Sequence, residues 1–541
     1  MLTLDSRPVY LIGFMATGKT TVGRILSERL GRRFVDLDEE IERATGKGVP
    51  ELFRTEGEAA FRRHEQAALE RLARERGAVI ACGGGTPCFG DNLSRMRATG
   101  VVVALGASID EILARIGDVS SRPLLSGPEG ARAAAEKLYR QREAAYRSAE
   151  VVVETGGRPI ERIADECARH VGQRLGHAAV LLGERTYPIH VAPISMGAEL
   201  VRSLCPTSTV AIVTDENVAR HGHPRRLRES LEGAGIRVTE VMIPPGERHK
   251  TLAQAESVAA SCVQAGLDRQ SVIMAVGGGV VGDLAGFVAA VLFRGVRVVQ
   301  VPTTLLAMID SAIGGKTGVD LAAGKNLLGA FWQPRFVLCD PATLETLPPR
   351  ELAAAFGEVV KYGLLGDSAL FAAVESRGAE LDLKDVIVRS ARLKAHVVAH
   401  DELETGKGGP ALARAGGRAI LNLGHTVGHA IEAASGMGEK GSLLHGECVA
   451  LGLIAAARLS ARIGACSAAL EPRVAQAVRR AGLPAEIDPW LRDDVLAYMA
   501  VDKKRVGGKV RFVVLEDVGS ARTVELSVSE ISSLLRPRRG E

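Results

Sequence analysis

Aromatic side chains are scarce in this chain, and neither sign of charge is in strong excess. Phe, Trp and Tyr make up 4% of the 541 residues, too few to supply the stacking surfaces on which proteins bind single-stranded nucleic acid. The 68 Lys and Arg nearly balance the 64 Asp and Glu, so the net charge is only +4. This balance indicates neither a nucleic acid nor a membrane surface as a partner.

Paired cysteines and a secretion signal are missing as well. The eight cysteines are scattered and none has CxxC spacing, which indicates neither a zinc ribbon nor a disulfide framework. The start of the chain, MLTLDSRPVYLIGF, lacks the basic segment and the long apolar stretch of a signal peptide. We therefore expect a protein of the reducing cytoplasm.

One apolar stretch, Ser271–Phe293, is long enough to cross a membrane. However, three consecutive glycines and Asp283 lie in its middle. A buried strand, a glycine turn and a helix explain this pattern better than a membrane span does.

The length of the chain predicts about three domains at roughly 100–200 residues each. Over the first 170 residues, apolar runs such as Val9–Ile12 alternate with helical patterns such as Thr20–Leu30, which predicts a parallel α/β sheet. The alternation pauses near 172–181, resumes, and gives way to helical periods after Asp340, for example over Ala419–Ala434. We predict an α/β protein with a first domain over 1–172, a linker over 173–180, an α/β subdomain over 181–339 and a mostly helical subdomain over 340–541.

The segment Gly13-Phe-Met-Ala-Thr-Gly18-Lys19-Thr20 fits the phosphate-binding loop G-x-x-x-x-G-K-[ST] between a strand and a helix. Glycines let backbone N–H groups turn toward phosphate oxygens, Lys19 adds charge, and Thr20 can bind Mg²⁺. Asp36 and Asp38 end the next strand-like run and therefore face the same crevice. We expect Asp36 to hold Mg²⁺ through water, and Asp38 to bind a substrate hydroxyl or to cap a helix.

Four further motifs follow in order: Phe61-Arg62-x-x-Glu65, Gly83-Gly84-Gly85, Arg122-Pro-Leu-Leu and Tyr146-Arg147. With the phosphate loop and the Asp-x-Asp pair, they make residues 8–170 resemble shikimate kinase. The resemblance implies that shikimate is held by Asp38, Arg62, Gly84, Gly85 and Arg147. It implies that ATP is bound by Gly13, Ala16, Gly18, Lys19, Thr20, Thr21 and Arg122, with Lys19 and Arg122 stabilising the transferring phosphate. Ala16 stands where relatives often carry Gly.

A second glycine turn, Gly277-Gly278-Gly279-Val-Val-Gly282-Asp283, follows a strand-like run and precedes a helix. Such a cluster alone is a weak dinucleotide signal. Polar residues near the ends of neighbouring strand-like runs favour a nicotinamide dinucleotide there: Asp215, Glu247, Lys250, Thr303 and Thr304.

Three of the twelve histidines crowd into residues 422–445. On a continuous helix, Arg418, Asn422, His425 and His429 share one face. Polar side chains are costly to bury without hydrogen-bond partners. This face is therefore either exposed to solvent or binds substrate and metal. Glu358 and Lys361 lie three residues apart and also share a face. Glu358 with two histidines makes a catalytic zinc-type site with one position open.

Further motifs extend along this half of the chain: Pro302-Thr-Thr-Leu-Leu-Ala-Met, Ile313-Gly-Gly-Lys-Thr-Gly, Gly324-Lys-Asn-Leu, His445-Gly-Glu and Asp502-Lys-Lys. With the glycine turn, the Glu358-x-x-Lys361 pair and the histidine cluster, they make residues 180–541 resemble 3-dehydroquinate synthase. The resemblance implies Zn²⁺ or Co²⁺ on Glu358, His425 and His445. It implies NAD⁺ contacts from Asp215, Glu247, Lys250, Gly278, Gly279, Asp283, Thr303, Thr304, Asp310, Lys316 and Lys325.

The substrate that the resemblance implies is a seven-carbon sugar acid, 3-deoxy-D-arabino-heptulosonate 7-phosphate. Its implied ligands are Arg294, Asp310, Lys316, Asn326, Lys361, Lys394, Arg418, Asn422, His429, Lys503 and Lys504. A basic cluster suits a substrate with a carboxylate and a phosphate. Lys316, Lys361 and His429 are the implied catalytic residues, and Arg294 reaches the site of a partner subunit in the homodimer expected of the family. NAD⁺ takes up and returns a hydride in the implied reaction, so it is not consumed.

The sequence thus predicts a bifunctional enzyme of the shikimate pathway. The loop over 406–417 is longer than is usual in the family and weakens substrate binding if it displaces Arg418. Asp320 stands where many relatives have Asn. The alternatives are a metal- and NAD-dependent polyol dehydrogenase in the second half, a gluconate-type kinase in the first half, or one half that only binds ligands.

Overall fold

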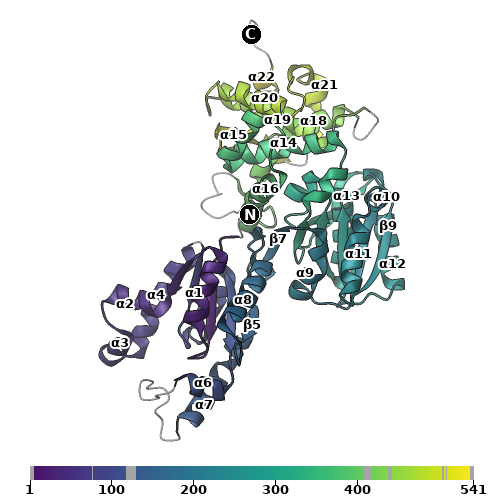
Figure 1. Ribbon diagram of the computed structural model, residues 1–541. Coiled ribbons are helices and arrows are strands. Elements are labelled where there is room, and N and C mark those ends of the chain that lie inside the picture. Colours follow the sequence, from purple (N-terminus) through teal and green to yellow (C-terminus); the bar gives the residue numbers. More distant parts are fainter. Residues whose placement is uncertain are drawn as a thin grey trace. The chain divides into compact units, whose positions relative to one another are not determined.

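The computed structural model describes residues 5–75, 77–116, 130–406, 416–436, 441–501, 505–506 and 509–536. The chain forms two compact units (Figure 1). The first comprises the described residues up to Gly176 together with Leu182–Thr186. The second comprises His177–Leu181 and the described residues from Tyr187 onward.

A parallel sheet of five strands forms the centre of the first unit, in the order β2-β3-β1-β4-β5. The strands are β1 (Val9–Gly13), β2 (Arg33–Asp36), β3 (Ala78–Ala81), β4 (Val101–Gly106) and β5 (Val151–Glu154). The helices are α1 (Lys19–Leu30), α2 (Leu37–Thr45), α3 (Val49–Thr55), α4 (Glu58–Arg74), α5 (Asn92–Thr99), α6 (Ile109–Ile116), α7 (Ala131–Arg147) and α8 (Ile160–Leu175). Val9 and Leu11 pack with α1 and α8, whereas Tyr10 and Ile12 pack on the opposite face with α2, α4 and α7. The predicted parallel α/β sheet is confirmed.

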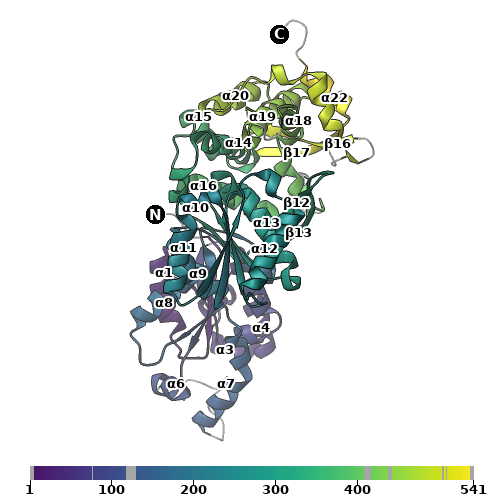
Figure 2. The ribbon, with the colours of Figure 1, turned by 90° about the vertical axis from the view of Figure 1, so that its right-hand side faces the viewer.

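The second unit contains a seven-stranded sheet in the order β6-β7-β14-β11-β10-β8-β9. Its strands are β6 (Ala178–Val180), β7 (Tyr187–Val191), β8 (Thr209–Asp215), β9 (Arg237–Ile243), β10 (Val272–Gly277), β11 (Arg297–Pro302) and β14 (Val337–Cys339). Strand β6 pairs antiparallel with β7, and the other described pairings in this sheet are parallel. Figure 2 shows the sheet between α9 (Gly197–Leu204) and α11 (His223–Gly233) on one face and α12 (Leu252–Gln264) and α13 (Gly279–Val291) on the other.

The apolar stretch Ser271–Phe293 forms strand β10, a glycine turn and helix α13, so the prediction of a strand, a turn and a helix is confirmed. Across the described part of the chain, no helix combines the length and the apolar character needed to cross a bilayer.

The segment predicted as a linker, 173–180, is instead regular structure. Helix α8 continues to Leu175, and β6 adds an edge strand to the sheet of the second unit. Leu175 and Val180 are fully buried. The linker prediction is wrong at these positions, because between α8 and β6 only Gly176 and His177 lie outside regular structure.

Helices dominate after Asp340, as predicted. They are α14 (Pro349–Gly366), α15 (Ser368–Arg377), α16 (Leu383–His400), α18 (His425–Ala434), α19 (His445–Arg462), α20 (Leu470–Arg480), α21 (Asp493–Leu496) and α22 (Val528–Leu535), and α10 (Glu216–Arg220) lies earlier in the chain. Two antiparallel pieces were not predicted: the hairpin of β12 (Lys316–Leu321) and β13 (Gly324–Phe331), and the sheet of β15 (Arg505–Val506), β16 (Lys509–Asp517) and β17 (Ser520–Leu526).

The continuous helix predicted over Ala419–Ala434 is wrong. Residues Gly417–Asn422 form a short 3₁₀ helix, η10, and α18 begins only after Gly424, which has a φ of 79°. Gly424 packs against α19, where a Cβ would lie 3.0 Å from the carbonyl oxygen of Val449. The chain therefore changes direction at Gly424, and the residues before it do not continue the face that carries the histidines.

Glycines let α14, α18 and α19 approach one another at backbone distance. A Cβ on Gly357 of α14 would collide with the carbonyl oxygen of Gly446 in α19, and a Cβ on Gly446 would collide with that of Ala354. Gly452 of α19 makes the same close approach to the carbonyl oxygen of Gly424. Because no side chain fits at these contacts, glycine is required where the helices cross.

We expect Gly357→Ala to lower the free energy of unfolding of the second unit by about 1–3 kcal/mol, because the added methyl group overpacks a backbone contact. Both tryptophans, Trp332 and Trp490, lie in this unit, so urea unfolding followed by tryptophan fluorescence reports on it. The control is Gly233→Ala, at a helical glycine with open space around its Cβ, which should be neutral or slightly stabilising. Equal stability of Gly357→Ala and the wild type would contradict this packing.

Candidate active sites

The predicted phosphate-binding loop lies between β1 and α1, at the carboxyl end of the parallel sheet. Gly13 and Gly18 have φ angles of 141° and 92°, and a Cβ on Gly13 would collide with the carbonyl oxygen of Leu105. Lys19 folds back over the loop, since its Nζ donates to the carbonyl oxygens of Gly13 at 3.0 Å and Phe14 at 2.9 Å. The loop therefore offers a glycine turn, a helix N-terminus and a positive charge, which together suit phosphate groups.

The predicted Mg²⁺ ligands also lie together. Thr20 Oγ1 donates to Asp36 Oδ2 at 2.9 Å, and Thr21 beside Thr20 in sequence is exposed. Ala16 has a φ of 58°, a left-handed conformation that costs a non-glycine residue about 1–2 kcal/mol. This strain explains the preference for glycine at that position. Arg122 lies outside the described residues.

Asp36, and not Asp38, caps the helix that follows β2. Its Oδ1 accepts a hydrogen bond from the Asp38 N–H at 3.1 Å, so the interpretation of Asp38 as the cap is wrong. The Asp38 carboxylate faces the glycine turn after β3, where Oδ1 lies 3.3 Å from the position of a Cβ on Gly83. Burial, with Asp36 and Glu65 nearby, raises the pKa of Asp38 to about 6.

The same glycine turn receives Arg62 from α4. A Cβ on Gly85 would lie 2.8 Å from Arg62 Nη2. The fully buried carboxylate of Glu65 holds Arg62 there, because it accepts from Arg62 Nη1 at 2.9 Å and from Thr86 Oγ1 at 2.5 Å. The turn thus brings together four of the predicted substrate residues: Asp38, Arg62, Gly84 and Gly85.

Arg147, the fifth predicted substrate residue, does not reach this turn. Its side chain is 77% exposed and pairs with Glu143. Arg142 is buried instead, and its Nη1 lies 3.6 Å from the position of a Cβ on Gly84. Tyr146 shares that face of α7, and its hydroxyl donates to the carbonyl oxygen of Gly84 at 2.6 Å. Arg142, and not the predicted Arg147, therefore lies at this turn, and its i, i+4 spacing from Tyr146 could have identified it.

In the second unit, the three predicted metal ligands converge between α14, α18 and α19. Nε2 of His425 lies 3.2 Å from Oε1 of Glu358, and Nε2 of His445 lies 3.6 Å from the same oxygen. Glu358 is fully buried; its Oε2 contacts Lys361 Nζ, and its Oε1 faces the two imidazoles. A buried carboxylate oxygen that faces two imidazole nitrogens fits a Zn²⁺ or Co²⁺ ion with one position open.

Glu358 keeps its charge in this buried position. Burial opposes ionisation, but Lys361 and His425 hold the pKa of Glu358 well below its usual range, and Lys361 Nζ contacts Glu358 Oε2 directly. The next residue, Tyr362, donates from its hydroxyl to Asp310 Oδ1 at 2.5 Å. This bond links the metal ligands to the cavity that Asp310 lines.

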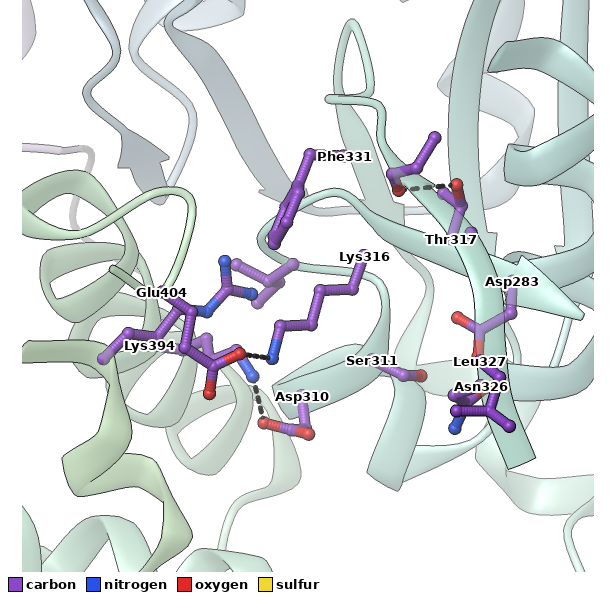
Figure 3. Close-up of a pocket in the computed structure, with 14 residues that line it drawn as sticks. Asp283, Asp310, Ser311, Lys316, Thr317, Asn326, Leu327, Phe331, Lys394 and Glu404 are labelled. Atoms are coloured by element: carbon purple, nitrogen blue, oxygen red, sulfur yellow. Dashed lines mark hydrogen bonds and ion pairs between the residues drawn. The ribbon is translucent and has the colours of Figure 1, made fainter. Parts of the chain in front are cut away.

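That cavity has a volume of about 520 Å³ (Figure 3). Nζ of Lys394 lies 2.5 Å from Asp310 Oδ1, and burial lowers the pKa of Lys394 to about 8. Cations at several points of the wall suit a substrate with anionic groups. The predicted NAD⁺ and substrate residues in the lining are Asp283, Asp310, Lys316, Asn326, Lys394 and Arg418.

Arg418 reaches the cavity although the loop before it is long. Its backbone N–H donates to Asp401 Oδ2 at 3.0 Å, and its Nη1 donates to the carbonyl oxygen of Glu402 at 2.7 Å. The side chain is buried and lines the cavity. The described ends of the loop therefore fix Arg418, while residues 407–415 lie outside the described part of the chain.

Glu404 is a cavity residue that the sequence analysis missed. Its carboxylate contacts Nζ of Lys316 across the cavity (Figure 3), and its backbone is left-handed with a φ of 57°. The signal in the sequence was weak, because Glu404 lies in a loop that has no periodic pattern.

The predicted nicotinamide residues surround the carboxyl ends of β8, β10 and β11. Gly278 precedes α13, where a Cβ would lie 3.3 Å from Thr304 Cγ2. Lys250 Nζ lies 2.6 Å from both Asp283 Oδ2 and Asn326 Oδ1, and burial raises the pKa of Asp283 to about 6. These contacts join the turn at α13 to the β12–β13 hairpin.

The remaining residues of this group lie near strand ends and helix starts. Gly279 begins α13, and Thr303 is buried at the end of β11. Glu247 Oε1 lies 3.7 Å from Lys250 Nζ. Asp215 caps α10, since its Oδ1 accepts from the Val218 N–H at 3.0 Å.

Asp320 supports the hairpin in which it stands in place of Asn. Its Oδ1 accepts from the Asn326 N–H at 2.8 Å, which holds Asn326 at a left-handed φ of 54°. An amide oxygen can accept the same bond, so the substitution preserves the turn.

Other predicted residues lie away from the cavity lining. Arg294 is exposed with a φ of 65°, and His429 is exposed on α18 with its ring centroid 5.3 Å from that of His425. Lys325 Nζ lies 4.0 Å from Glu432 Oε1, and Asn422 ends η10 half-buried. Lys503 and Lys504 lie outside the described residues.

These features define a phosphate-loop kinase joined to an α/β and helical enzyme with a candidate metal centre. Residues 15–171 match the family described as shikimate kinase. Residues 240–354 match the 3-dehydroquinate synthase N-terminal family, and residues 355–505 match the C-terminal one.

Similar proteins support the synthase assignment. The 3-dehydroquinate synthase of Caulobacter vibrioides is 44% identical over 354 residues, which cover 63% of this chain and 92% of that protein. The same enzyme of Rhodospirillum rubrum is 45% identical over 354 residues, covering 63% and 89%. A structure of 2-deoxy-scyllo-inosose synthase, complexed with carbaglucose-6-phosphate, NAD⁺ and Co²⁺, is 27% identical with a TM-score of 0.57, covering 66% of this chain and 98% of that one.

The chain belongs to the 3-dehydroquinate synthase family, and a shikimate kinase domain precedes the synthase. It is a bifunctional enzyme with shikimate kinase and 3-dehydroquinate synthase activities. The matches favour the synthase over a polyol dehydrogenase in the second unit, and shikimate kinase over a gluconate-type kinase in the first.

Proposed function

We propose that the first unit transfers a phosphoryl group from ATP to the 3-hydroxyl group of shikimate at the crevice beside its phosphate loop. The observation that carries this assignment is the meeting of a phosphate loop, a buried carboxylate and two largely buried arginines at one glycine turn. Asp38 would accept a hydrogen bond from a shikimate hydroxyl. Arg62 and Arg142 would pair with the shikimate carboxylate, as guanidinium groups do in two-point contacts.

The phosphate loop supplies the other half of this reaction. Lys19 would neutralise charge on the transferring phosphoryl group, and Arg122 would add to it. Thr20 and Asp36, already joined by a hydrogen bond, would hold the Mg²⁺ that accompanies ATP. The residues act by position and charge, which is what phosphoryl transfer requires of a protein.

Substitutions of Arg142 and Arg147, both on α7, distinguish this proposal from the prediction made from the sequence. Arg142→Ala should raise the KM for shikimate roughly 10- to 100-fold, because it removes hydrogen bonds to a charged group worth about 1.5–3 kcal/mol. Arg147→Ala, on the exposed face of the same helix, should change the KM less than twofold. Steady-state kinase assays measure both. The reverse ranking would restore Arg147 as the substrate residue.

We propose that the second unit converts 3-deoxy-D-arabino-heptulosonate 7-phosphate to 3-dehydroquinate and phosphate in the cavity beside the metal ligands. The cluster of Glu358, His425 and His445 next to a cavity lined by cations carries this assignment. These three residues would hold Zn²⁺ or Co²⁺. When bound, the metal ion polarises a substrate hydroxyl and NAD⁺ accepts and returns a hydride.

The cations of the cavity would bind the two ends of the substrate. Lys394 and Arg418 are buried in its wall, and Lys316 extends across it. Glu404 neutralises Lys316 and Asp310 neutralises Lys394, so each cation has a counter-charge until anionic groups of the substrate arrive. The further proposed ligands are Asn326, Lys361, Asn422, His429, Lys503 and Lys504.

We place the nicotinamide dinucleotide at the carboxyl edge of the second sheet. Lys250 and Asp283 would lie against it, beside Gly278 and Gly279, with further contacts proposed from Asp215, Glu247, Thr303, Thr304 and Lys325. We also propose a cytoplasmic homodimer through the second unit, in which the exposed Arg294 extends toward the site of the partner subunit.

Catalytic use of NAD⁺ tests the synthase proposal. Purified full-length protein given the heptulosonate phosphate and sub-stoichiometric NAD⁺ should release many phosphate ions per NAD⁺ without accumulating NADH. Chelation should stop the release, and Zn²⁺ or Co²⁺ should restore it. Net NADH formation from an alcohol would favour a polyol dehydrogenase, and a folded, metal-loaded protein that releases no phosphate would identify an inactive module.

The buried Lys394 predicts an alkaline limit for the synthase. Its pKa is lowered to about 8, so the ammonium is present below pH 8 and is lost as the pH rises above it. We expect kcat/KM to fall about tenfold per pH unit above this value. Lys394→Gln, uncharged at every pH, should have a low kcat/KM without this limb, and Lys384→Gln on the exposed start of α16 should behave as the wild type. If kcat/KM of Lys394→Gln still fell above pH 8 as in the wild type, the alkaline fall would belong to another group.

A further inference from the structure

One carboxylate beside the metal ligands has no part in the function proposed above. Glu432 lies near the end of α18, and its Oε2 is 3.0 Å from Nδ1 of His445. The other ring nitrogen, Nε2, faces Oε1 of Glu358 at 3.6 Å. His445 therefore stands between two carboxylates, one for each ring nitrogen.

This placement decides which nitrogen of His445 carries a proton. A neutral imidazole has one N–H donor and one nitrogen lone pair, and an ionised carboxylate can only accept. Glu432 therefore keeps the proton on Nδ1, which leaves the Nε2 lone pair directed at the metal position. A carboxylate in this role fixes the ring orientation and makes the nitrogen ligand more basic.

We propose that Glu432 is a positioning residue for the metal centre, which orients His445 and strengthens its bond to the ion. This inference rests on the proposed metal site of Glu358, His425 and His445. Lys325 of the β12–β13 hairpin lies 4.0 Å from Glu432 Oε1. Glu432 therefore also joins the metal centre to the hairpin that carries Asn326.

A second arrangement of the same groups has to be distinguished. His429, Glu432 and His445 also lie close enough together to hold an ion. However, that ion would need Nδ1 of His445 as a ligand, and the Nδ1 proton already bonds to Glu432. His429 is exposed, with its ring centroid 5.8 Å from that of His445. The geometry thus favours one ion on Nε2 and a hydrogen bond on Nδ1.

The experiment measures zinc binding by the chelated full-length protein, in competition with a chromophoric chelator and without substrate. Glu432→Ala should bind Zn²⁺ roughly 10- to 100-fold more weakly than the wild type, and Glu432→Gln, which keeps an oxygen acceptor, should lose less. The control is Glu375→Ala. Glu375 is a carboxylate of matched exposure, 21% against 19%, that is paired with Arg473 away from the site. Fluorescence of Trp332 and Trp490, which both lie in the second unit, verifies that this unit is folded in each variant.

The stoichiometry and the Co²⁺ absorption spectrum complete the test. One ion per chain, with a changed Co²⁺ spectrum in Glu432→Ala, supports the positioning role. Wild-type affinity in both Glu432 variants would overturn it and leave the proposed metal site intact. Two ions in the wild type and one in Glu432→Ala would make Glu432 a ligand, which also overturns it. A wild type that binds no zinc would overturn this inference together with the proposed metal site.

Discussion

Helices α14 and α19 cross where Gly357 and Gly446 meet neighbouring carbonyl groups without a side chain between them, and the metal centre depends on this crossing. Glu358 follows Gly357, and His445 precedes Gly446, so a wider crossing would separate the carboxylate from the imidazole. The contact between Gly452 and Gly424 places α18 in the same way, directly before His425. Each metal ligand thus stands beside a glycine that sets the spacing of its helix.

The charges of the second site are paired before any substrate arrives. Lys361 contacts Glu358, Lys394 contacts Asp310, and Lys316 contacts Glu404. A buried charge without a partner would be very costly, whereas a paired one is tolerated. Anionic groups of the substrate therefore replace the protein carboxylates as partners of lysines that are already ordered. This order reduces the side-chain entropy lost on binding.

Much of this arrangement could be predicted from the sequence where a local pattern carries the information. The strands of the first sheet and β8, β9, β10, β11 and β14 of the second follow from apolar runs, whereas β6 and β7 were not predicted. The metal ligands follow from the motifs around Glu358 and His425. The Tyr146-Arg147 pair points to Arg147 only as a sequence neighbour, whereas a helix places Arg142 and Tyr146, four residues apart, on one face. The break at Gly424 and the inward turn of Glu404 depend on tertiary contacts that a single sequence does not display.

The chain passes between its two units more than once, and this limits where it can be cut to separate them. Residues His177–Leu181 belong to the second unit, Leu182–Thr186 to the first, and the chain then returns to the second. A synthase that began at Tyr187 would lose β6 and leave the backbone groups along one side of β7 unpaired. Exposed strand edges recruit other chains. Cutting the fusion at that point would therefore make β7 an exposed edge of the sheet and a site of aggregation.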